Sequence, residues 1–221
     1  MSTVTWRRVA LVAAAIGVLG ACASDVTYVS ADKDGAFFRL PDRYTVFEVA
    51  SGQKPTDRPV ADAGNVPPTF QRVFDRSKSP SADNLQQAKP ADPVGRMSVF
   101  YVSASSIDEL SPQAVRSATA GVGDDPLALA QSQPAKVEIV RFDRLNQGAL
   151  SGSRVVFNNQ LDAGGWVTKD LTTLIDPRPH VRENGSQVFK VYLLDVRCES
   201  ACFKANRAEI DDIVQSFQVR R

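Results

Sequence analysis

Apolar positions along the chain fall mostly at the spacing of β-strands. Two short runs at 36–40 and 43–50 flank Pro41-Asp42, a pair typical of a tight turn. Longer runs predict five further strands, at 97–104, 136–144, 152–159, 166–175 and 187–197. The last of these runs is apolar on both faces, which favours a central place in a sheet. Short connections that carry Gly or Asn between the later strands are typical of antiparallel neighbours.

Two short helices are predicted between the strands at 97–104 and 136–144. Ser111-Pro112 and Asp125-Pro126 each place a capping side chain before a proline, which is a common start of a helix. We expect the first helix to end near Gly121 and the second to run through Ala130.

The C-terminal segment predicts one amphipathic helix. Its apolar residues recur at i, i+3, i+4 and i+7 and form one stripe, which consists of Ile210, Ile213, Val214 and Phe217. Asn206 can cap this helix, and Glu209 can return the bond to the cap. We expect the opposite face to point into water, with Asp211, Asp212 and Gln215.

Residues 51–95 differ in composition from the rest of the chain. They hold seven of the thirteen prolines and few aliphatic side chains, which predicts a loop or a partly disordered insert. Within it, Phe70, Val73 and Phe74 sit at helical spacing and predict one docked turn. We therefore expect a single domain at 35–221 that carries this Pro-rich insert.

The N-terminus has the three parts of an export signal. Arg7 and Arg8 precede Val9–Leu19, an uncharged apolar run of eleven residues. As a helix this run spans about 16 Å, roughly half a bilayer core, so a cleaved signal peptide at 1–21 is favoured over a spanning helix. General secretion fits better than twin-arginine export, because the residues around the arginine pair match that second signal only loosely.

The segment closes with Leu19-Gly20-Ala21-Cys22, which resembles the lipobox of bacterial lipoproteins. The resemblance implies cleavage between Ala21 and Cys22 and diacylation of the Cys22 thiol. Residues 22–34 then form a short tether, and the mature chain carries 24 basic and 25 acidic side chains because Arg7 and Arg8 are removed. The alternative is a plain secretory signal with a chance cysteine.

The remaining cysteines, Cys198 and Cys202, are separated by three residues. In an exported chain this spacing favours a local disulfide that fixes the corner between a strand and a helix. A redox centre more often shows two intervening residues, and a zinc site needs about four ligands, while His180 is the only histidine in the chain.

Both ends of the chain resemble one family. The opening GAFFRLPDRYTVFE and the closing VYLLDVRCESACFKANRAEIDDIVQSFQV are similar to the ends of actinobacterial LpqN-like lipoproteins, whose domain has the Mog/PsbP-like fold. The resemblance implies an α+β fold, mainly an antiparallel β-sheet with α-helices packed on both faces. It brings no catalytic residues, because members serve as binding or accessory proteins.

Charge and motifs exclude several function classes. The net charge is +1, and the Arg pairs near 178–182 and 220–221 lack interleaved aromatics, so nucleic acid is not an expected partner. Serine-hydrolase, phosphate-loop, dinucleotide and zinc-protease motifs are absent from the sequence. His180 lies between prolines and Glu183-Asn184-Gly185, which predicts an exposed turn. Asp124-Asp125 is interpreted as a helix entry rather than a metal pair. We predict no catalytic residue, no metal site and no cofactor.

The sequence thus predicts an exported lipoprotein, anchored at the outer face of the cell membrane through acylated Cys22. The leading function is a non-catalytic accessory domain that binds another protein of the cell envelope. The alternative is a carrier or sensor of a small apolar ligand or lipid, with a pocket lined by strand aromatics such as Phe37, Phe38, Tyr44, Phe100, Tyr101 and Trp166. A third function is a hydrolase with an unrecognised site.

Overall fold

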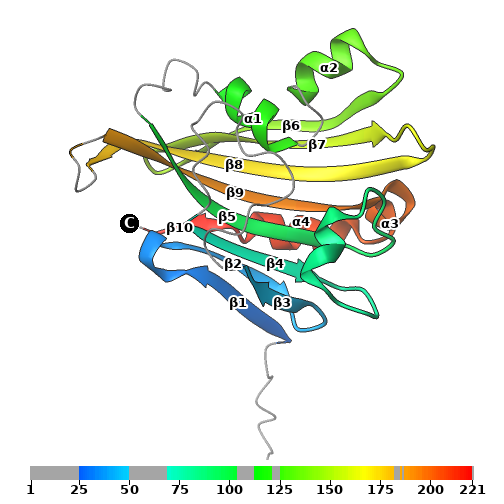
Figure 1. The fold of residues 1–221 in the computed structure, drawn as a ribbon, viewed down its shortest axis with the longest axis horizontal. Coiled ribbons are helices and arrows are strands. Elements are labelled where there is room, and N and C mark those ends of the chain that lie inside the picture. The colour runs from blue at the N-terminus through cyan, green and yellow to red at the C-terminus, as the bar shows by residue number, and fades with distance from the viewer. Residues whose placement is uncertain are drawn as a thin grey trace, which may run out of the picture.

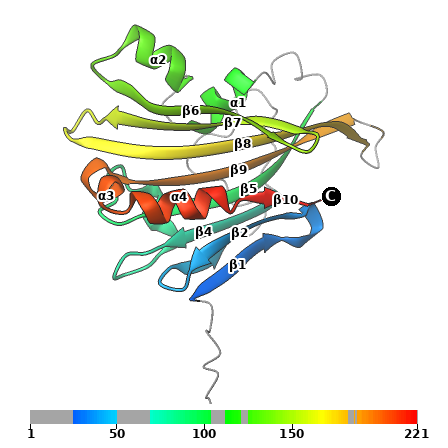
Figure 2. The same ribbon diagram turned by 180° about the vertical axis from the view of Figure 1, so that it is seen from behind.

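The computed structural model describes residues 25–49, 69–103, 112–120, 125–181, 185 and 187–220. This part of the chain forms two antiparallel sheets (Figures 1 and 2). The smaller sheet has the order β1-β2-β10, and its strands are β1 (Val26–Ala31), β2 (Ala36–Pro41) and β10 (Gln218–Val219). A 3-10 helix, η1 (Asp32–Asp34), connects its first two strands. The tether expected at 22–34 is therefore wrong from Val26 onward, because these residues belong to the smaller sheet.

The larger sheet has seven strands in the order β3-β4-β5-β9-β8-β7-β6. Their bounds are β3 (Thr45–Glu48), β4 (Phe70–Asp75), β5 (Val94–Ser103), β6 (Val137–Gln147), β7 (Leu150–Gln160), β8 (Trp166–Val181) and β9 (Gln187–Glu199). Every pair is antiparallel, which confirms the pairing predicted from the short connections. The central place predicted for the run at 187–197 is also confirmed, because β9 lies between β5 and β8.

Four α-helices and a second 3-10 helix accompany the sheets in the described residues. They are α1 (Pro112–Ala120), α2 (Pro126–Ser132), α3 (Ser200–Ala205), α4 (Arg207–Gln215) and η2 (Ala82–Gln86). None of them is long and apolar enough to cross a membrane. The Asp125 cap is confirmed, since its side chain accepts a bond from Leu127 N. Leu110, Ser111 and Gly121 lie outside the described residues.

Strand alternation divides the buried side chains into two clusters. Along β9, Tyr192, Leu194 and Val196 join the cluster that contains the apolar stripe of α4. Val191 and Leu193 point to the opposite face and join the cluster that contains Val115 and Ala120 of α1. β9 is buried from Val188 to Cys198 because both of its faces are covered in this way.

The expected turn at Phe70, Val73 and Phe74 is wrong. These residues belong to strand β4, which pairs with β3 and β5. Val73 and Phe74 are at most 1% exposed, and no strand pattern is visible in the sequence because polar Gln71 and Asp75 are buried together with them. The C-terminal part of the expected insert is therefore integral to the larger sheet, while residues 51–68 lie outside the described residues.

The predicted capping box of the C-terminal helix is also wrong. Asn206 makes no side-chain cap bond at the start of α4. Its side-chain amide instead donates to Cys202 O at 2.8 Å, and its carbonyl accepts from Arg76 Nη1 at 2.6 Å. Glu209 likewise points away from the cap, toward Tyr44 and Arg76. Asn206 and Glu209 therefore bind side chains that are distant in the sequence, in place of each other's backbone.

Candidate functional site: two hollows beside the C-terminal helices

Two hollows lie between the C-terminal helices and strands β6 to β8, on the face of the sheet toward the viewer in Figure 2. The first, the Ser200 hollow, has a volume of about 310 Å³ and opens between β6–β8 and the start of α3 and α4. The second, the Phe217 hollow, has a volume of about 260 Å³ and lies beside the end of α4. Arg141 lines both, so they are neighbours along one groove.

A β-bulge sets which side chains of β6 line this groove. The register shifts by one residue between Ile139, which opposes Phe157, and Arg141, which opposes Val156. Ile139 and Phe157 pack with the cluster under α1, whereas Val156 packs with the cluster under α4. Simple alternation along a strand would place Arg141 on the same face as Ile139. The extra residue Val140 places Arg141 on the opposite face instead.

The polar wall of the Ser200 hollow is a chain of three hydrogen-bonded side chains, Ser200, Thr168 and Asn158. Thr168 Oγ1 lies 2.6 Å from Asn158 Oδ1 and 2.8 Å from Ser200 Oγ. Asn158 Nδ2 donates to Glu138 at 2.8 Å, so Asn158 Oδ1 takes the single hydroxyl proton of Thr168. The contact between Thr168 and Ser200 then uses the Ser200 proton. Ser200 Oγ therefore offers the hollow lone pairs rather than a proton.

The other walls of the Ser200 hollow are apolar and cationic. Val140, Val156 and Phe203 supply the apolar wall. The charged lining residues are Arg141, Lys204, Arg207 and Asp211, which are three cations and one carboxylate. Lys204 is exposed and has no hydrogen-bond or ion-pair partner among the residues that the structure describes.

A buried ion pair separates the two hollows. Arg154 Nε and Nη2 donate to both oxygens of Asp170, at 3.0 and 2.5 Å, and Arg154 also contacts Asp211 on α4. The side chains of Arg154 and Asp170 are 5% and 0% exposed. Burial raises the pKa of Asp170, and the hydrogen bonds and charge of Arg154 oppose that shift. Asp211 was expected to face water, but it is the common partner of Arg154, Arg141 and Arg207.

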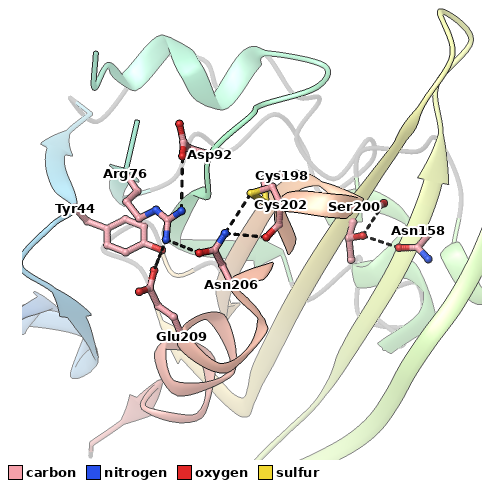
Figure 3. The surroundings of a disulfide bond; sticks show 10 residues. Tyr44, Arg76, Asp92, Asn158, Cys198, Ser200, Cys202, Asn206 and Glu209 are labelled. Carbon is pink, nitrogen blue, oxygen red and sulfur yellow. Dashed lines mark hydrogen bonds and ion pairs between the residues drawn. A yellow bond between two sulfur atoms is a disulfide. The ribbon is translucent and has the colours of Figure 1, made fainter. Parts of the chain in front are cut away.

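The predicted disulfide is present at the corner where β9 meets α3. Cys198 and Cys202 are bonded, with their Cα atoms 6.0 Å apart. Figure 3 shows Arg76 and Asn206 beside it, and Arg76 connects Asn206 with Glu209 and with Asp92. This network holds the corner and the start of α4 against the loop that follows β4.

His180 lies in a strand and not in the predicted turn. It is part of β8, opposite Val188 of β9, and its side chain is 38% exposed. Its Nε2 is 3.9 Å from Asp176 Oδ2, and its ring stands edge-on to Tyr101 with centroids 6.0 Å apart. Lys190 lies close by and bonds Asp34 of η1 at 2.9 Å, so this cluster ties the two sheets together.

The aromatic side chains that we expected around a ligand are used in other ways. Phe38, Tyr44 and Phe100 are core residues, exposed by 8% or less. Tyr101 donates a hydrogen bond to Asp34 at 3.0 Å, and Phe37 stacks under Arg220. None of these residues lines either hollow.

Other predicted site residues fall outside the described part of the chain. Ala21, Cys22 and Asp124 all belong to this group. Asp125 forms two hydrogen bonds with Arg116 at 2.9 and 3.0 Å. Among the described residues, no group of three or more His, Cys, Asp or Glu side chains is placed to hold a metal ion.

The groove itself was not predicted. Its walls come from β6–β8 and from α3–α4, which are far apart in the sequence. Arg141, Asp143 and Leu145 are two residues apart, which indicates one strand face with both charged and apolar side chains. The bulge that directs this face toward α4 has no glycine and no other mark in the sequence.

Comparison with known proteins yields solved structures only. No family model and no curated protein matches the chain. The structure is similar to that of cyanobacterial PsbP from Synechocystis sp. PCC 6803, with a TM-score of 0.47 and 13% identity over 92% of this chain and 100% of that one. It is also similar to LpqN, a protein involved in cell envelope biogenesis of Mycobacterium tuberculosis, with a TM-score of 0.47 and 13% identity over 89% and 91% of the two chains.

Proposed function

We propose that this chain is an exported lipoprotein, held at the outer face of the cell membrane by acylated Cys22, whose body binds another component of the cell envelope. The observation that carries the proposal is the order of the N-terminal segment: an arginine pair, eleven apolar residues, and then Leu19-Gly20-Ala21-Cys22. Two acyl chains of about fifteen methylenes each contribute roughly 20 kcal/mol of membrane affinity, so this anchor is effectively permanent.

The anchor also limits how far the body can lie from the membrane. Strand β1 begins at Val26, four residues after Cys22. Four residues reach at most about 14 Å even when fully extended. The smaller sheet, which begins with β1, is therefore the part of the fold closest to the lipid surface, and a partner has to reach the groove from the side or from above.

A binding role, rather than catalysis, is supported by how the charged groups of the groove are used. The guanidinium of Arg154 is already shared between the carboxylates of Asp170 and Asp211. The polar wall of the Ser200 hollow is also internally satisfied, since Ser200, Thr168 and Asn158 form a chain that ends at Glu138. Among the described residues, Ser200 Oγ is hydrogen-bonded to Thr168 and not to a base that could activate it as a nucleophile.

The anchoring is tested by replacing Cys22 with serine. We expect the native protein to fractionate with membranes at the mass of a processed, acylated chain. The Cys22→Ser protein should lose both the added acyl mass and the cleavage between Ala21 and Cys22. Cys202→Ser is the matched control, because it removes a different cysteine and should still be acylated. If the Cys22→Ser and native proteins have the same mass, the proposal is wrong.

The partner is tested by crosslinking in intact cells, followed by mass spectrometry. We expect an envelope protein to be enriched with the native chain and to be reduced with the Cys22→Ser chain, which has lost its position at the membrane. If both chains recover the same set of proteins, or if neither recovers any above background, the chain has no anchored partner.

A carrier of a small ligand is the second candidate function. It is favoured by the Ser200 hollow, whose volume of about 310 Å³ lies at the lower end of the range for ligand pockets and whose wall includes Val140, Val156 and Phe203. Native mass spectrometry of gently purified protein tests it. A ligand that copurifies at one molecule per chain supports a carrier, and a bare protein mass counts against one.

A further inference from the structure

The lining of the Ser200 hollow is divided into chemically different ends. Lys204 and Arg207 come from α3 and α4, whereas the polar wall consists of Asn158 on β7, Thr168 on β8 and Ser200. Because the hydroxyl proton of Ser200 is used by Thr168, the polar wall offers the hollow an acceptor. A hydrogen-bond acceptor repels an anion, so the wall that contains Ser200 suits an apolar or hydrogen-donating part of a ligand. The end that contains Lys204 and Arg207 attracts an anion.

The cations at this end have unused binding capacity. Asp211 is the only carboxylate among the lining residues, and it already serves Arg154, Arg141 and Arg207. Arg207 contacts Asp211 only through Nε, at 3.8 Å, which leaves its two Nη atoms without a partner among the described residues. Lys204 has no partner in the described part of the chain. A guanidinium fork and an ammonium together form a natural cradle for phosphate or carboxylate.

Arg141 reaches this hollow because of the bulge at Val140. If the same residues paired regularly from Ile139 onward, Val140 would oppose Val156, and Arg141 would point to the face that α1 covers. The bulge therefore adds a third cation to the hollow, which Asp143 partly neutralises at 2.5 Å. It also leaves Val140 beside the hollow as an exposed apolar side chain, with 45% of its surface accessible.

We propose that the Ser200 hollow binds a small organic anion, whose phosphate or carboxylate group lies at Lys204 and Arg207 and whose apolar part packs against Val140, Val156 and Phe203. The proposal names the ligand class for the second candidate function and rests on that candidate alone. It does not depend on the lipid anchor. The volume suits one compact molecule rather than a lipid with two acyl chains.

Calorimetric titration of the purified full-length protein in non-ionic detergent tests this proposal with three probes. Phenyl phosphate carries both the anion and an apolar ring, phenol carries the ring with a hydroxyl, and inorganic phosphate carries the anion alone. Titration into detergent without protein gives the background from micelles. We expect phenyl phosphate to bind at least tenfold more tightly than either of the other two probes.

The cationic end is tested by Lys204→Gln together with Arg207→Gln. Both side chains are exposed, so the fold should persist, and we expect phenyl phosphate to bind about tenfold more weakly while phenol is unaffected. Lys33→Gln together with Lys78→Gln is the matched control, since it removes the same charge from exposed positions outside the hollow. This control should bind phenyl phosphate like the native chain.

Several outcomes would overturn the proposal. In two of them, phenol or inorganic phosphate binds as tightly as phenyl phosphate. In the others, the control variant weakens binding of phenyl phosphate as much as the Lys204→Gln and Arg207→Gln variant does, or none of the probes binds. The Cys22→Ser chain should bind phenyl phosphate as the native chain does, so a failure here is distinguishable from a failure of the anchor.

Vesicles distinguish two sources of such a ligand. Displacement of phenyl phosphate by vesicles that contain phosphatidic acid, but not by pure phosphatidylcholine vesicles, assigns the site to a lipid headgroup. Lack of displacement by both assigns it to a free anion. Either result supports binding of an anion in this hollow.

Discussion

The hydroxyl group of Tyr44 donates a hydrogen bond of 2.7 Å to Glu209 Oε1, across 165 positions of the sequence. Tyr44 lies in the turn after β2, and Glu209 lies in the first turn of α4. Glu209 also contacts Arg43 and Arg76, so it binds groups that precede β3 and follow β4. One carboxylate thus fixes the C-terminal helix to both sheets, in place of the local cap that its sequence position suggests.

We predict that Tyr44→Phe lowers the free energy of unfolding by about 1 kcal/mol, the usual net value of one hydrogen bond. Burial raises the pKa of Tyr44 to about 12 from an ordinary 10.0. The folded state therefore holds this proton more tightly than the unfolded state, and stability should fall as the pH rises from 10 to 12. Urea unfolding across this pH range measures both effects.

Tyr28→Phe is the matched control, because Tyr28 is 62% exposed on β1. We expect its unfolding free energy to match that of the native protein, and its alkaline loss of stability to remain unchanged. The Tyr44→Phe protein should lose less stability between pH 10 and 12 than either. Identical alkaline curves for all three proteins would show that Tyr44 does not carry the effect.

Removal of Arg154 should be costly. The change Arg154→Met leaves Asp170, which is fully buried, without its guanidinium partner, and we expect a loss of about 3–5 kcal/mol at pH 7. Burial raises the pKa of Asp170, so the carboxyl group can take up a proton in this variant as the pH falls. The loss should therefore be smaller at pH 5 than at pH 7, as measured by urea unfolding at both values.

The double change Arg154→Met and Asp170→Leu tests the same pair without an unpaired charge. We expect it to recover most of the lost stability, because a buried ion pair contributes little beyond the cost of its own desolvation. A double variant that is as unstable as Arg154→Met would show that packing around Arg154, and not the isolated charge of Asp170, causes the loss.

Asp75 should contribute stability that acid removes. Burial alone raises the pKa of Asp75, but bonds from Ser77 N, Ser81 N, Asn84 Nδ2 and the Ser77 hydroxyl more than offset this and hold it below its ordinary value. Because the folded-state pKa is lowered, this stability is present at neutral pH and is lost as the pH falls through that pKa. We expect Asp75→Asn to be less stable by about 2 kcal/mol at pH 7 and by less at pH 3.

Asp83→Asn serves as the control for this prediction, since Asp83 is exposed in η2 close to the same loop. Its unfolding free energy should follow that of the native chain at both pH values. A loss at pH 3 as large as that at pH 7 in Asp75→Asn would contradict an ionised Asp75 as the cause.

The disulfide should contribute about 2 kcal/mol, because it closes a loop of only a few residues. We expect a strong reductant to lower the unfolding free energy of the native protein by this amount. Cys198→Ala together with Cys202→Ala should be less stable than the oxidised native chain and insensitive to the reductant. Sensitivity that persists in this double variant would assign the effect to something other than this bond.

The predicted strands were confirmed where the apolar pattern was strong on its own. The run at 187–197 predicted a central strand because it carries apolar residues on both faces, and β9 is central. β4 was missed because it buries Gln71 and Asp75 beside its apolar residues. Asp75 can be buried because Ser77, Ser81 and Asn84 bond it from the segment that follows the strand, and a strand pattern does not contain these partners.

The candidate site was less predictable for the same reason. The Cys198–Cys202 bond follows from the spacing of two residues, and it was predicted. The pairing of Arg154 with Asp170 and Asp211 joins β7, β8 and α4, and its geometry depends on their register. Asp211 lies opposite the apolar stripe of the helix and was therefore expected to face water. This was wrong, because the same side of the helix also meets the edge of the sheet.

The bulge at Val140 makes one position of β6 different from all the others. Deletion of Val140 would leave Ile139 opposite Phe157 and Arg141 opposite Val156, so every other side chain of the strand would keep its face. Deletion of a residue elsewhere in β6 would instead turn one part of the strand over. Relatives of this chain are therefore expected to lose a residue at this position more readily than at its neighbours.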